Sequence, residues 1–198
     1  RKIMYVATKK QAKEIVANAA NDVNMPYITE RWPGGMLTNF VTIRKAVKKM
    51  SAIDKMKSDG TFMVLSKRER LQIDRQRAKL EKNLGSISDM TRLPAALFVV
   101  DVMRESIAIL EAKKLGIPTF AIVDTNSDPE LIDFPIPAND DASKSITTIM
   151  NVITASVKEG LSERKKEKEV QAAAKKDEAS KEEAKSEKTA EADKPKKE

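Results

Sequence analysis

The sequence lacks cysteine and histidine altogether, and only 4% of its 198 residues are aromatic. These two absences exclude disulfide bonds, thiolate or imidazole metal ligands and every catalytic triad built on Cys or His. No apolar run approaches the roughly 20 residues of a membrane span, and no charged start followed by an apolar stretch indicates a signal peptide. We therefore expect a cytoplasmic protein with no membrane partner, no metal site and no cofactor.

Charged residues make up 34% of the chain, which, with so few aromatics, indicates a small core for this length. We expect one compact domain with an appendage. The chain begins with Arg1 and not with Met, and the apolar run IMYVA (residues 3–7) follows almost at once. We therefore expect that the protein's own beginning is missing.

Positive charge is concentrated in one segment. Residues 44–92 hold 14 Lys/Arg against 6 Asp/Glu, a net charge of +8, whereas the whole chain carries +7. Residues 93–160 are acidic, with 5 Lys/Arg against 10 Asp/Glu. Residues 161–198 are nearly balanced, with 12 Lys/Arg against 11 Asp/Glu. A solvated helix face usually mixes both signs, so this one-sided excess favours a polyanionic partner such as nucleic acid.

Residues 37–92 are predicted to form an antiparallel helical hairpin. From Phe40 the apolar residues recur every three or four positions, which indicates a helix with a narrow apolar seam. Thr38 or Asn39 offers an N-cap side chain for this helix, and Ser58-Asp59-Gly60 breaks it.

The second helix of the hairpin follows an apolar stretch, FMVL (residues 62–65), which we interpret as a clasp between the helices. Ser66 and Glu69 have the spacing of a capping box. Polar Gln76 and Arg77 interrupt the apolar seam of the second helix. We therefore expect a partly wet hairpin of modest stability.

An α/β core is predicted on both sides of the hairpin, over residues 1–36 and 93–160. The apolar runs AALFVV (residues 95–100) and PTFAIV (residues 118–123) are typical of parallel strands buried on both faces, and a helix from Ser106 to Leu115 connects them. This order predicts a parallel sheet flanked by helices, with the layering of Rossmann and flavodoxin-like folds.

The C-terminal part is predicted to hold one extended loop, one helix and a tail. The loop contains Asp128-Pro129 and Pro135-Ile136-Pro137, and Asn139-Asp140-Asp141 precedes the helix as its cap. The core should end near Gly160. Residues 161–198 are Lys, Glu and Ala with almost nothing larger that is apolar, so we expect disorder there, with transient helix only from Glu163 to Lys176.

Four motifs carry a resemblance: RWPGGMLTNF (residues 31–40), LPAALFVVD (93–101), DTNSDP (124–129) and IPANDDA (136–142). In order and spacing, and together with the basic hairpin, they resemble the bacterial small-subunit ribosomal proteins of the S2 family. The resemblance runs from about residue 3 to about residue 160. Pro33 stands where that family commonly has Leu, and Ala138 where it has Gly; both are local loop changes. The strand and helices with which the family begins are absent.

The resemblance implies a non-enzymatic structural constituent of the small ribosomal subunit. Such a protein contacts 16S rRNA near the junction of head and body, contacts other small-subunit ribosomal proteins, and helps to dock the ribosomal protein that recruits mRNA. RNA helices display phosphates and 2′-hydroxyls more accessibly than base edges, so this role requires a shaped basic surface and no small-molecule substrate.

The candidate rRNA-binding residues are the hairpin cations with a few side chains of the core. Trp32 either stacks on RNA or plugs the base of the hairpin, and Lys9 and Lys10 either bind phosphate at a helix N-terminus or are ordinary solvated lysines. Arg70 and Lys79 accompany the candidates on the second helix. The full set is Lys9, Lys10, Arg31, Trp32, Asn39, Arg44, Lys45, Lys48, Lys49, Lys67, Arg68, Arg75 and Arg92.

Two other functions stay open from the residues alone. Aspartates gather at predicted strand ends, where α/β enzymes place active sites, so a small-molecule or sugar-phosphate enzyme is the main alternative. No Gly-rich phosphate loop supports it. In a third reading, the hairpin binds proteins. Within the ribosomal reading, the acidic segment is the side expected to face proteins, through Asp124, Asp128, Asp140 and Asp141.

Overall fold

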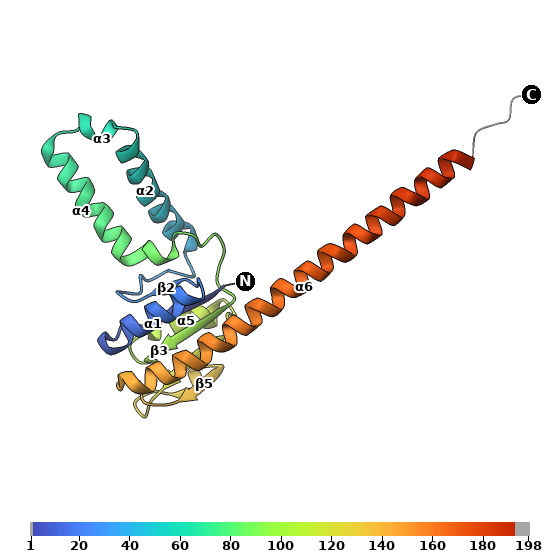
Figure 1. Cartoon of the computed structure of the whole chain (residues 1–198). Coiled ribbons are helices and arrows are strands. Elements are labelled where there is room, and N and C mark those ends of the chain that lie inside the picture. Colours follow the sequence, from blue (N-terminus) through green and yellow to red (C-terminus); the bar gives the residue numbers. More distant parts are fainter. Residues whose placement is uncertain (1, 193–198) are drawn as a thin grey trace, which may run out of the picture. The chain divides into compact units, whose positions relative to one another are not determined.

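The computed structural model describes the backbone of residues 2–192 and the side chains of residues 2–167. It contains two compact units, Arg1–Thr154 and Ala155–Glu198. The first unit holds a β-sheet and a helical hairpin (Figure 1). Among the described residues, no helix is long and apolar enough to cross a membrane.

A five-stranded sheet forms the centre of the first unit. Its strands are β1 (Ile3–Val6), β2 (Tyr27–Ile28), β3 (Ala96–Val100), β4 (Thr119–Val123) and β5 (Phe134–Pro137). They lie in the order β2-β1-β3-β4-β5, and every neighbouring pair is parallel. The predicted α/β fold is therefore confirmed. The chain leaves β1 toward one edge of the sheet and β3 toward the other, so the topological switch point lies between these strands.

The few aromatic side chains gather in this sheet. The strand register aligns Tyr27, Tyr5, Phe98, Phe120 and Phe134 in one row across all five strands. The ring centroids of Tyr5 and Phe98 are 5.6 Å apart, and Phe120 stacks on Phe134 at 4.6 Å. Cross-strand neighbours on one face pack directly against one another. A chain with two Tyr and five Phe thus places five of these rings in a single row.

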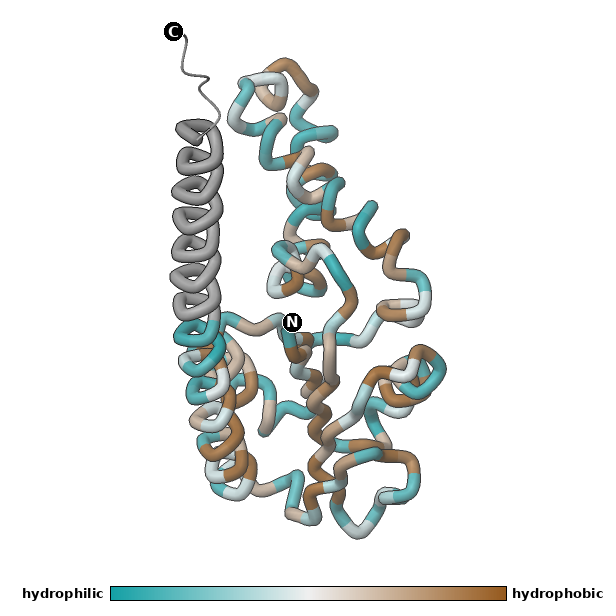
Figure 2. The backbone as a smooth tube through the Cα atoms, turned by 90° about the vertical axis from the view of Figure 1, so that its right-hand side faces the viewer, coloured by the Kyte–Doolittle hydropathy of each residue, from teal (hydrophilic) through white to brown (hydrophobic). Residues whose placement is uncertain are grey.

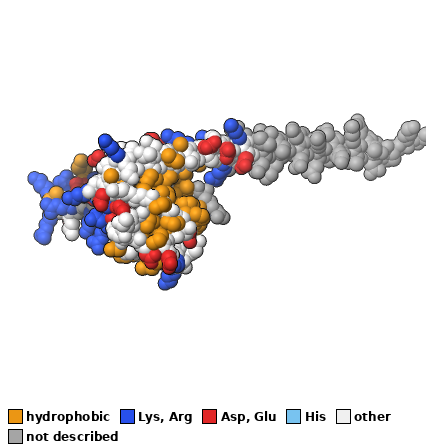
Figure 3. Space-filling view, turned by 90° about the horizontal axis from the view of Figure 1, so that it is seen from below, with side chains coloured by type: hydrophobic (Ala, Val, Ile, Leu, Met, Phe, Trp, Pro, Cys, Tyr) orange, Lys and Arg blue, Asp and Glu red, His pale blue; other side chains and the backbone are white. Residues whose placement is uncertain are grey.

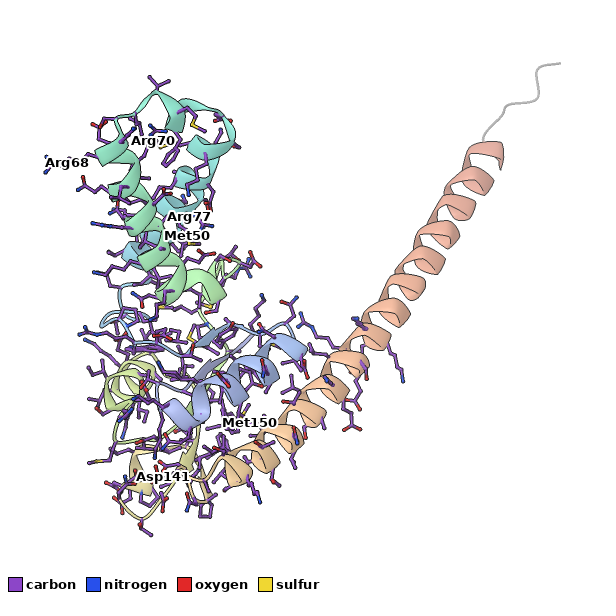
Figure 4. The ribbon with its side chains drawn as sticks, turned by 60° about the vertical axis from the view of Figure 1, so that its left-hand side comes forward. Met50, Arg68, Arg70, Arg77, Asp141 and Met150 are labelled. Carbon is purple, nitrogen blue, oxygen red and sulfur yellow. The ribbon has the colours of Figure 1, made fainter. Side chains whose placement is uncertain are left out.

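Helices cover both faces of the sheet. Outside the hairpin they are α1 (Lys10–Asp22), α5 (Ser106–Lys114) and α6 (Ser143–Ala192). Within the first unit, α1 and the start of α6 lie on one face and α5 on the other (Figures 1 and 4). Val16, Ile109, Ile146 and Met150 are buried from these helices. Hydrophobic residues colour the strands between them (Figure 2), so the core is the sheet with its helix contacts.

One predicted loop is a strand. Asp128 caps a short 3-10 helix, η2 (Pro129–Leu131), by accepting a hydrogen bond from the Glu130 amide at 2.9 Å. The chain then pairs with β4 as β5, although Pro135 and Pro137 suggested a loop. β5 is an edge strand, where a proline can be accommodated because its missing N–H faces away from the sheet.

The hairpin lies between β2 and β3 in the sequence. It consists of α2 (Phe40–Ser58), α3 (Thr61–Val64), α4 (Lys67–Leu84) and the 3-10 helix η1 (Gly85–Ile87). The predicted capping box is present: the Glu69 amide donates to Ser66 Oγ at 3.4 Å, and the Ser66 amide donates to Glu69 Oε2 at 3.0 Å. Gly60 turns the chain between α2 and α3 with a φ of +74°, a conformation that favours glycine.

Ion pairs join α2 and α4 where polar residues interrupt the apolar seam of the hairpin. Arg77 of α4 pairs with Asp54 of α2 through its Nε, and Lys57 Nζ of α2 lies 2.6 Å from Asp74 Oδ1 of α4. Figure 4 shows Arg77 near Met50 in the middle of the hairpin. The residue that interrupts the seam in the sequence thus joins the two helices.

The apolar clasp predicted at residues 62–65 is wrong. Met63 is 74% exposed and Val64 is 87% exposed. Four residues of helix α3 occupy the turn, so these side chains point to solvent at the hairpin tip. Phe62 is partly buried, with Lys57 Nζ 5.4 Å from its ring centroid, a distance typical of a cation–π contact.

The core ends before the predicted tail. Thr154 is the last buried residue among the side chains that the structure describes. The helix α6 nevertheless continues to Ala192, beyond the transient helix predicted from Glu163 to Lys176. Lys, Glu and Ala are strong helix formers, but a helix without buried contacts is marginal in water. Disorder of residues 161–198 in solution stays a prediction, and residues 193–198 lie outside the described residues.

Candidate nucleic-acid interface

The hairpin is anchored to the core by one buried carboxylate. Glu111, on α5, is 8% exposed and accepts hydrogen bonds from the loop of residues 32–38. Trp32 Nε1 donates to Oε1 at 3.2 Å, and the Gly35 amide donates to the same oxygen at 2.7 Å. Oε2 accepts from three donors: the Leu37 amide at 2.9 Å, the Thr38 amide at 3.0 Å and Thr38 Oγ1 at 3.1 Å. One side chain thus organises the loop from which α2 begins.

These donors favour the ionised form of Glu111. Burial alone would raise the pKa of its carboxyl group, but the hydrogen bonds from the Thr38, Leu37 and Gly35 amides and from Trp32 outweigh burial and lower it. Gly35 has a φ of +83°, and a Cβ there would lie 3.3 Å from Asn39 Cβ. A side chain at position 35 would therefore strain the backbone whose amide donates to Glu111.

The expectation that Trp32 contacts RNA needs correction. The side chain is only 6% exposed and belongs to the core cluster that also holds Leu84 and Ile87 from the end of the hairpin. Its indole N–H is already bonded to Glu111. Stacking on a base would require Trp32 to leave this core, so its role is to pack the base of the hairpin against the sheet.

A set of cations on the hairpin is exposed and free of protein carboxylates. Among the described side chains, no ion pair involves any of them. Arg68 lies toward the tip of α4 (Figure 4). α2 alone carries six Lys/Arg against one Asp. The set comprises the predicted residues Arg44, Lys45, Lys48, Lys49, Lys67, Arg68 and Arg75, with Lys79 beside them.

Three other hairpin cations, Arg77, Lys57 and Lys82, have carboxylate partners. Arg77 and Lys57 join α2 to α4, as described above. Lys82 Nζ lies 3.2 Å from Glu30 Oε2, a carboxylate that Lys13 also approaches at 3.4 Å. This division separates the cations that hold the hairpin together from those that face outward.

Lys9 does not present a free ammonium to phosphate. The residue is 9% exposed, and its Nζ lies 2.6 Å from Asp141 Oδ1, 2.7 Å from Asp140 Oδ1 and 3.6 Å from Asp101 Oδ2. Burial would lower the pKa of Lys9, but the hydrogen bonds to Asp140 and Asp141 outweigh it and raise the pKa. The predicted phosphate contact at Lys9 is therefore wrong: its three carboxylate neighbours would repel an anion.

The aspartates expected to face proteins separate into two groups. Asp140 is 1% exposed and paired with Lys9, so a protein-facing role for its side chain is wrong. Asp128 and Asp141 are exposed and Asp124 is partly exposed. Asp124, Asp140 and Asp141 place oxygens within 4.8 Å of one another. A hard cation prefers such ligands, although the Lys9 ammonium already contacts two of the three.

The other predicted site residues are accessible. Lys10 begins α1, Arg31 opens the loop before the hairpin, and Arg92 follows it; all three are exposed. Asn39 occupies the N-cap position of α2, but its side chain makes no bond to the helix backbone and accepts from Thr42 Oγ1 at 2.9 Å. Arg31, Asn39 and Arg92 flank the hairpin helices in the sequence, whereas Lys10 belongs to α1 of the core.

Sequence reasoning missed Glu111 and Asp54. Glu111 is the single acidic residue of α5 and follows the apolar run of residues 107–110, and that position was the only signal for a buried role. Asp54 is the single acidic residue of α2, and its isolation among lysines could have indicated a partner on α4.

The comparisons with known proteins agree on one family. A family model described as Ribosomal protein S2 matches residues 1–160. Curated relatives named "Small ribosomal subunit protein uS2" include those of Flavobacterium johnsoniae (75% identical over 87% of this chain) and Flavobacterium psychrophilum (73% over 85%). The relative from Phocaeicola vulgatus is 68% identical over 85% of the chain. These alignments span 68%, 64% and 60% of the relatives' own lengths. With a match over its whole α/β core and hairpin, the chain belongs to the ribosomal protein S2 family.

Proposed function

We propose that this chain is a structural, non-enzymatic component of the small ribosomal subunit in translation, and that its hairpin binds rRNA. The relatives are named as small ribosomal subunit proteins, which supports membership of that subunit. The observation that carries the RNA contact is the set of exposed, carboxylate-free cations on α2 and α4. A one-sided cationic surface of this kind matches the phosphate backbone of folded RNA.

The acidic segment after the hairpin, residues 93–160, is suited to proteins and not to RNA. Residues 93–160 carry 10 Asp/Glu against 5 Lys/Arg, and this charge repels phosphate. Hydrophobic side chains also gather on the face seen from below (Figure 3). Met103, Ile107 and Leu110, at and before α5, are 64%, 55% and 60% exposed. Other small-subunit proteins, including the one that recruits mRNA, are the proposed partners of this side, with contacts near the junction of head and body.

The test compares two triple charge reversals. One changes Lys45, Lys48 and Lys49 of α2 to Glu; its control changes Lys113, Lys114 and Lys144, equally exposed lysines outside the hairpin. Each protein is mixed with small subunits stripped of this component, sedimented through a salt wash and quantified. We expect the hairpin variant to lose about tenfold or more in affinity and the control to stay near the unchanged protein. Equal retention of both variants would place the RNA contact elsewhere.

A further inference from the structure

A small cavity opens beside the basic face of α2. It has a volume of about 160 Å³ and lies between the first three turns of α2 and the segment of residues 87–91 that follows α4. Phe40, Ile43 and Val47 supply apolar walls, and these residues are only partly buried because they pack on the core cluster from one side. The cavity therefore offers apolar surface that the fold leaves uncovered.

The charge around this cavity has one sign. Arg44 and Lys48 line it, one helical turn apart on the same face of α2, and no Asp or Glu is among its lining residues, all of which the structure describes. A larger cavity of about 430 Å³ near β2 differs in this respect, since Glu81 and Asp89 line it together with Lys2. Only the smaller cavity combines an apolar interior with a purely cationic rim.

Hydroxyl groups complete the rim. Ser51 on α2 and Ser88 and Thr91 on the opposite wall line the cavity and are exposed. Ser51 Oγ donates to the Val47 carbonyl at 3.4 Å, which leaves its lone pairs available. The cavity thus offers apolar walls for a flat ring, hydroxyl groups for its polar edge and two cations for the charges beside it.

We infer that this cavity takes one unstacked base of an RNA strand, with the phosphates on either side held by Arg44 and Lys48. The inference rests on the proposed function and deepens it. Cations alone would bind any RNA helix, whereas a fully paired stem keeps its bases stacked inside and has nothing to insert. The hairpin therefore prefers RNA with a bulged or looped-out nucleotide over paired RNA of equal charge.

The experiment uses the full chain and two RNA probes. One is a fully paired stem, and the other is the same stem with a single bulged adenosine. Wild-type protein binds the bulged stem about tenfold more tightly, an effect within the range that stacking of one base contributes. The loss of affinity on raising the salt concentration is nearly the same for both probes, because their phosphates differ by one.

The matched variants are Ser51→Trp, which fills the cavity, and Ser58→Trp on the same helix outside it. Both serines are exposed, and each donates its Oγ to a backbone carbonyl of the preceding turn. Ser51→Trp abolishes the preference for the bulge while binding to the paired stem persists, and Ser58→Trp changes neither. Thr91→Trp fills the cavity from the opposite wall and serves if Ser51→Trp fails to fold, as judged by its thermal unfolding.

The outcomes separate the two proposals. Salt-dependent binding without preference for the bulge, or a preference that survives both Ser51→Trp and Thr91→Trp, overturns the base-binding cavity and leaves the rRNA-binding hairpin intact. This is also the result if a protein segment occupies the cavity. Salt-independent binding, or no binding to either probe, overturns the hairpin as an RNA surface as well.

Discussion

Lysines in two regions of the molecule have opposite surroundings. At the carboxyl ends of the strands, Lys9 is buried and lies within 3.6 Å of three carboxylates. On the hairpin, Lys45, Lys48 and Lys49 are exposed and pair with no described carboxylate. The ammonium of Lys9 is occupied by carboxylates, whereas those of the other three lysines are accessible to a phosphate. Under the proposed function, the local balance of charge, and not the residue type, decides which lysines bind RNA.

The largest effect on stability is expected from Lys9→Met. The substitution leaves Asp101 and Asp140 buried without their cation, and breaking a buried ion pair from one side costs about 3–5 kcal/mol. The free energy of unfolding in urea measures it. Lys48→Met is the control from the other region, and we expect a change within about 0.5 kcal/mol. Equal effects of the two substitutions would abolish the distinction between the regions.

Glu111→Gln should have the next largest effect. The amide retains one oxygen for the five donors, and its own N–H groups face those of the loop, so buried donors lose their acceptor at a cost of about 2–3 kcal/mol. We also expect faster proteolysis within residues 31–39, because the loop loses its anchor. Unchanged unfolding and proteolysis would show that the hairpin root is held by Trp32 and its apolar neighbours alone.

Acid unfolding sharpens the comparison, because the pKa values of two buried glutamates are shifted in opposite directions. Glu111 lies on α5, and Glu105 is the N-cap residue of the same helix. The pKa of Glu111 is lowered, so its contribution is present above the ordinary value of 4.5 and is lost as the pH falls through its folded pKa. Burial raises the pKa of Glu105, only partly offset by hydrogen bonds from Thr8, so its protonation favours the folded state as the pH falls.

The two Gln variants therefore differ from the wild type in opposite directions over the range from about pH 6 to pH 3, Glu105→Gln above the ordinary value of 4.5 and Glu111→Gln below it. Glu111→Gln makes the acid loss of stability shallower, and Glu105→Gln makes it steeper. Urea unfolding across this pH range measures both slopes. Slopes that change in the same direction would contradict the different hydrogen bonding of the two carboxyl groups.

The smallest effect is expected at the hairpin tip. Replacing Met63 and Val64 by Ser should change the free energy of unfolding by less than about 0.5 kcal/mol, because both side chains already face solvent. Thermal unfolding of the double variant measures this. Loss of more than about 1 kcal/mol would restore the apolar clasp that the sequence suggested.

The fold was predictable where local patterns decide it. The apolar runs of β3 and β4, the helix between them and the capping box at Ser66 and Glu69 depend on neighbours in sequence. The site was less predictable because long-range pairs decide it. Lys9 meets Asp140 across 131 residues and Trp32 meets Glu111 across 79. Such distant pairing buried two predicted RNA contacts, while the exposed hairpin cations that pair with no carboxylate among the described side chains remained candidates.

The central claim is that the hairpin binds rRNA through its free cations, and the salt dependence of the affinity of the full chain for 16S rRNA tests it most directly. If four cations contact phosphates, a fourfold rise in salt lowers the affinity roughly a hundredfold. The Lys45, Lys48 and Lys49 reversal should flatten this dependence. An affinity that is level across the salt range, or a slope that the reversal leaves unchanged, would contradict the account.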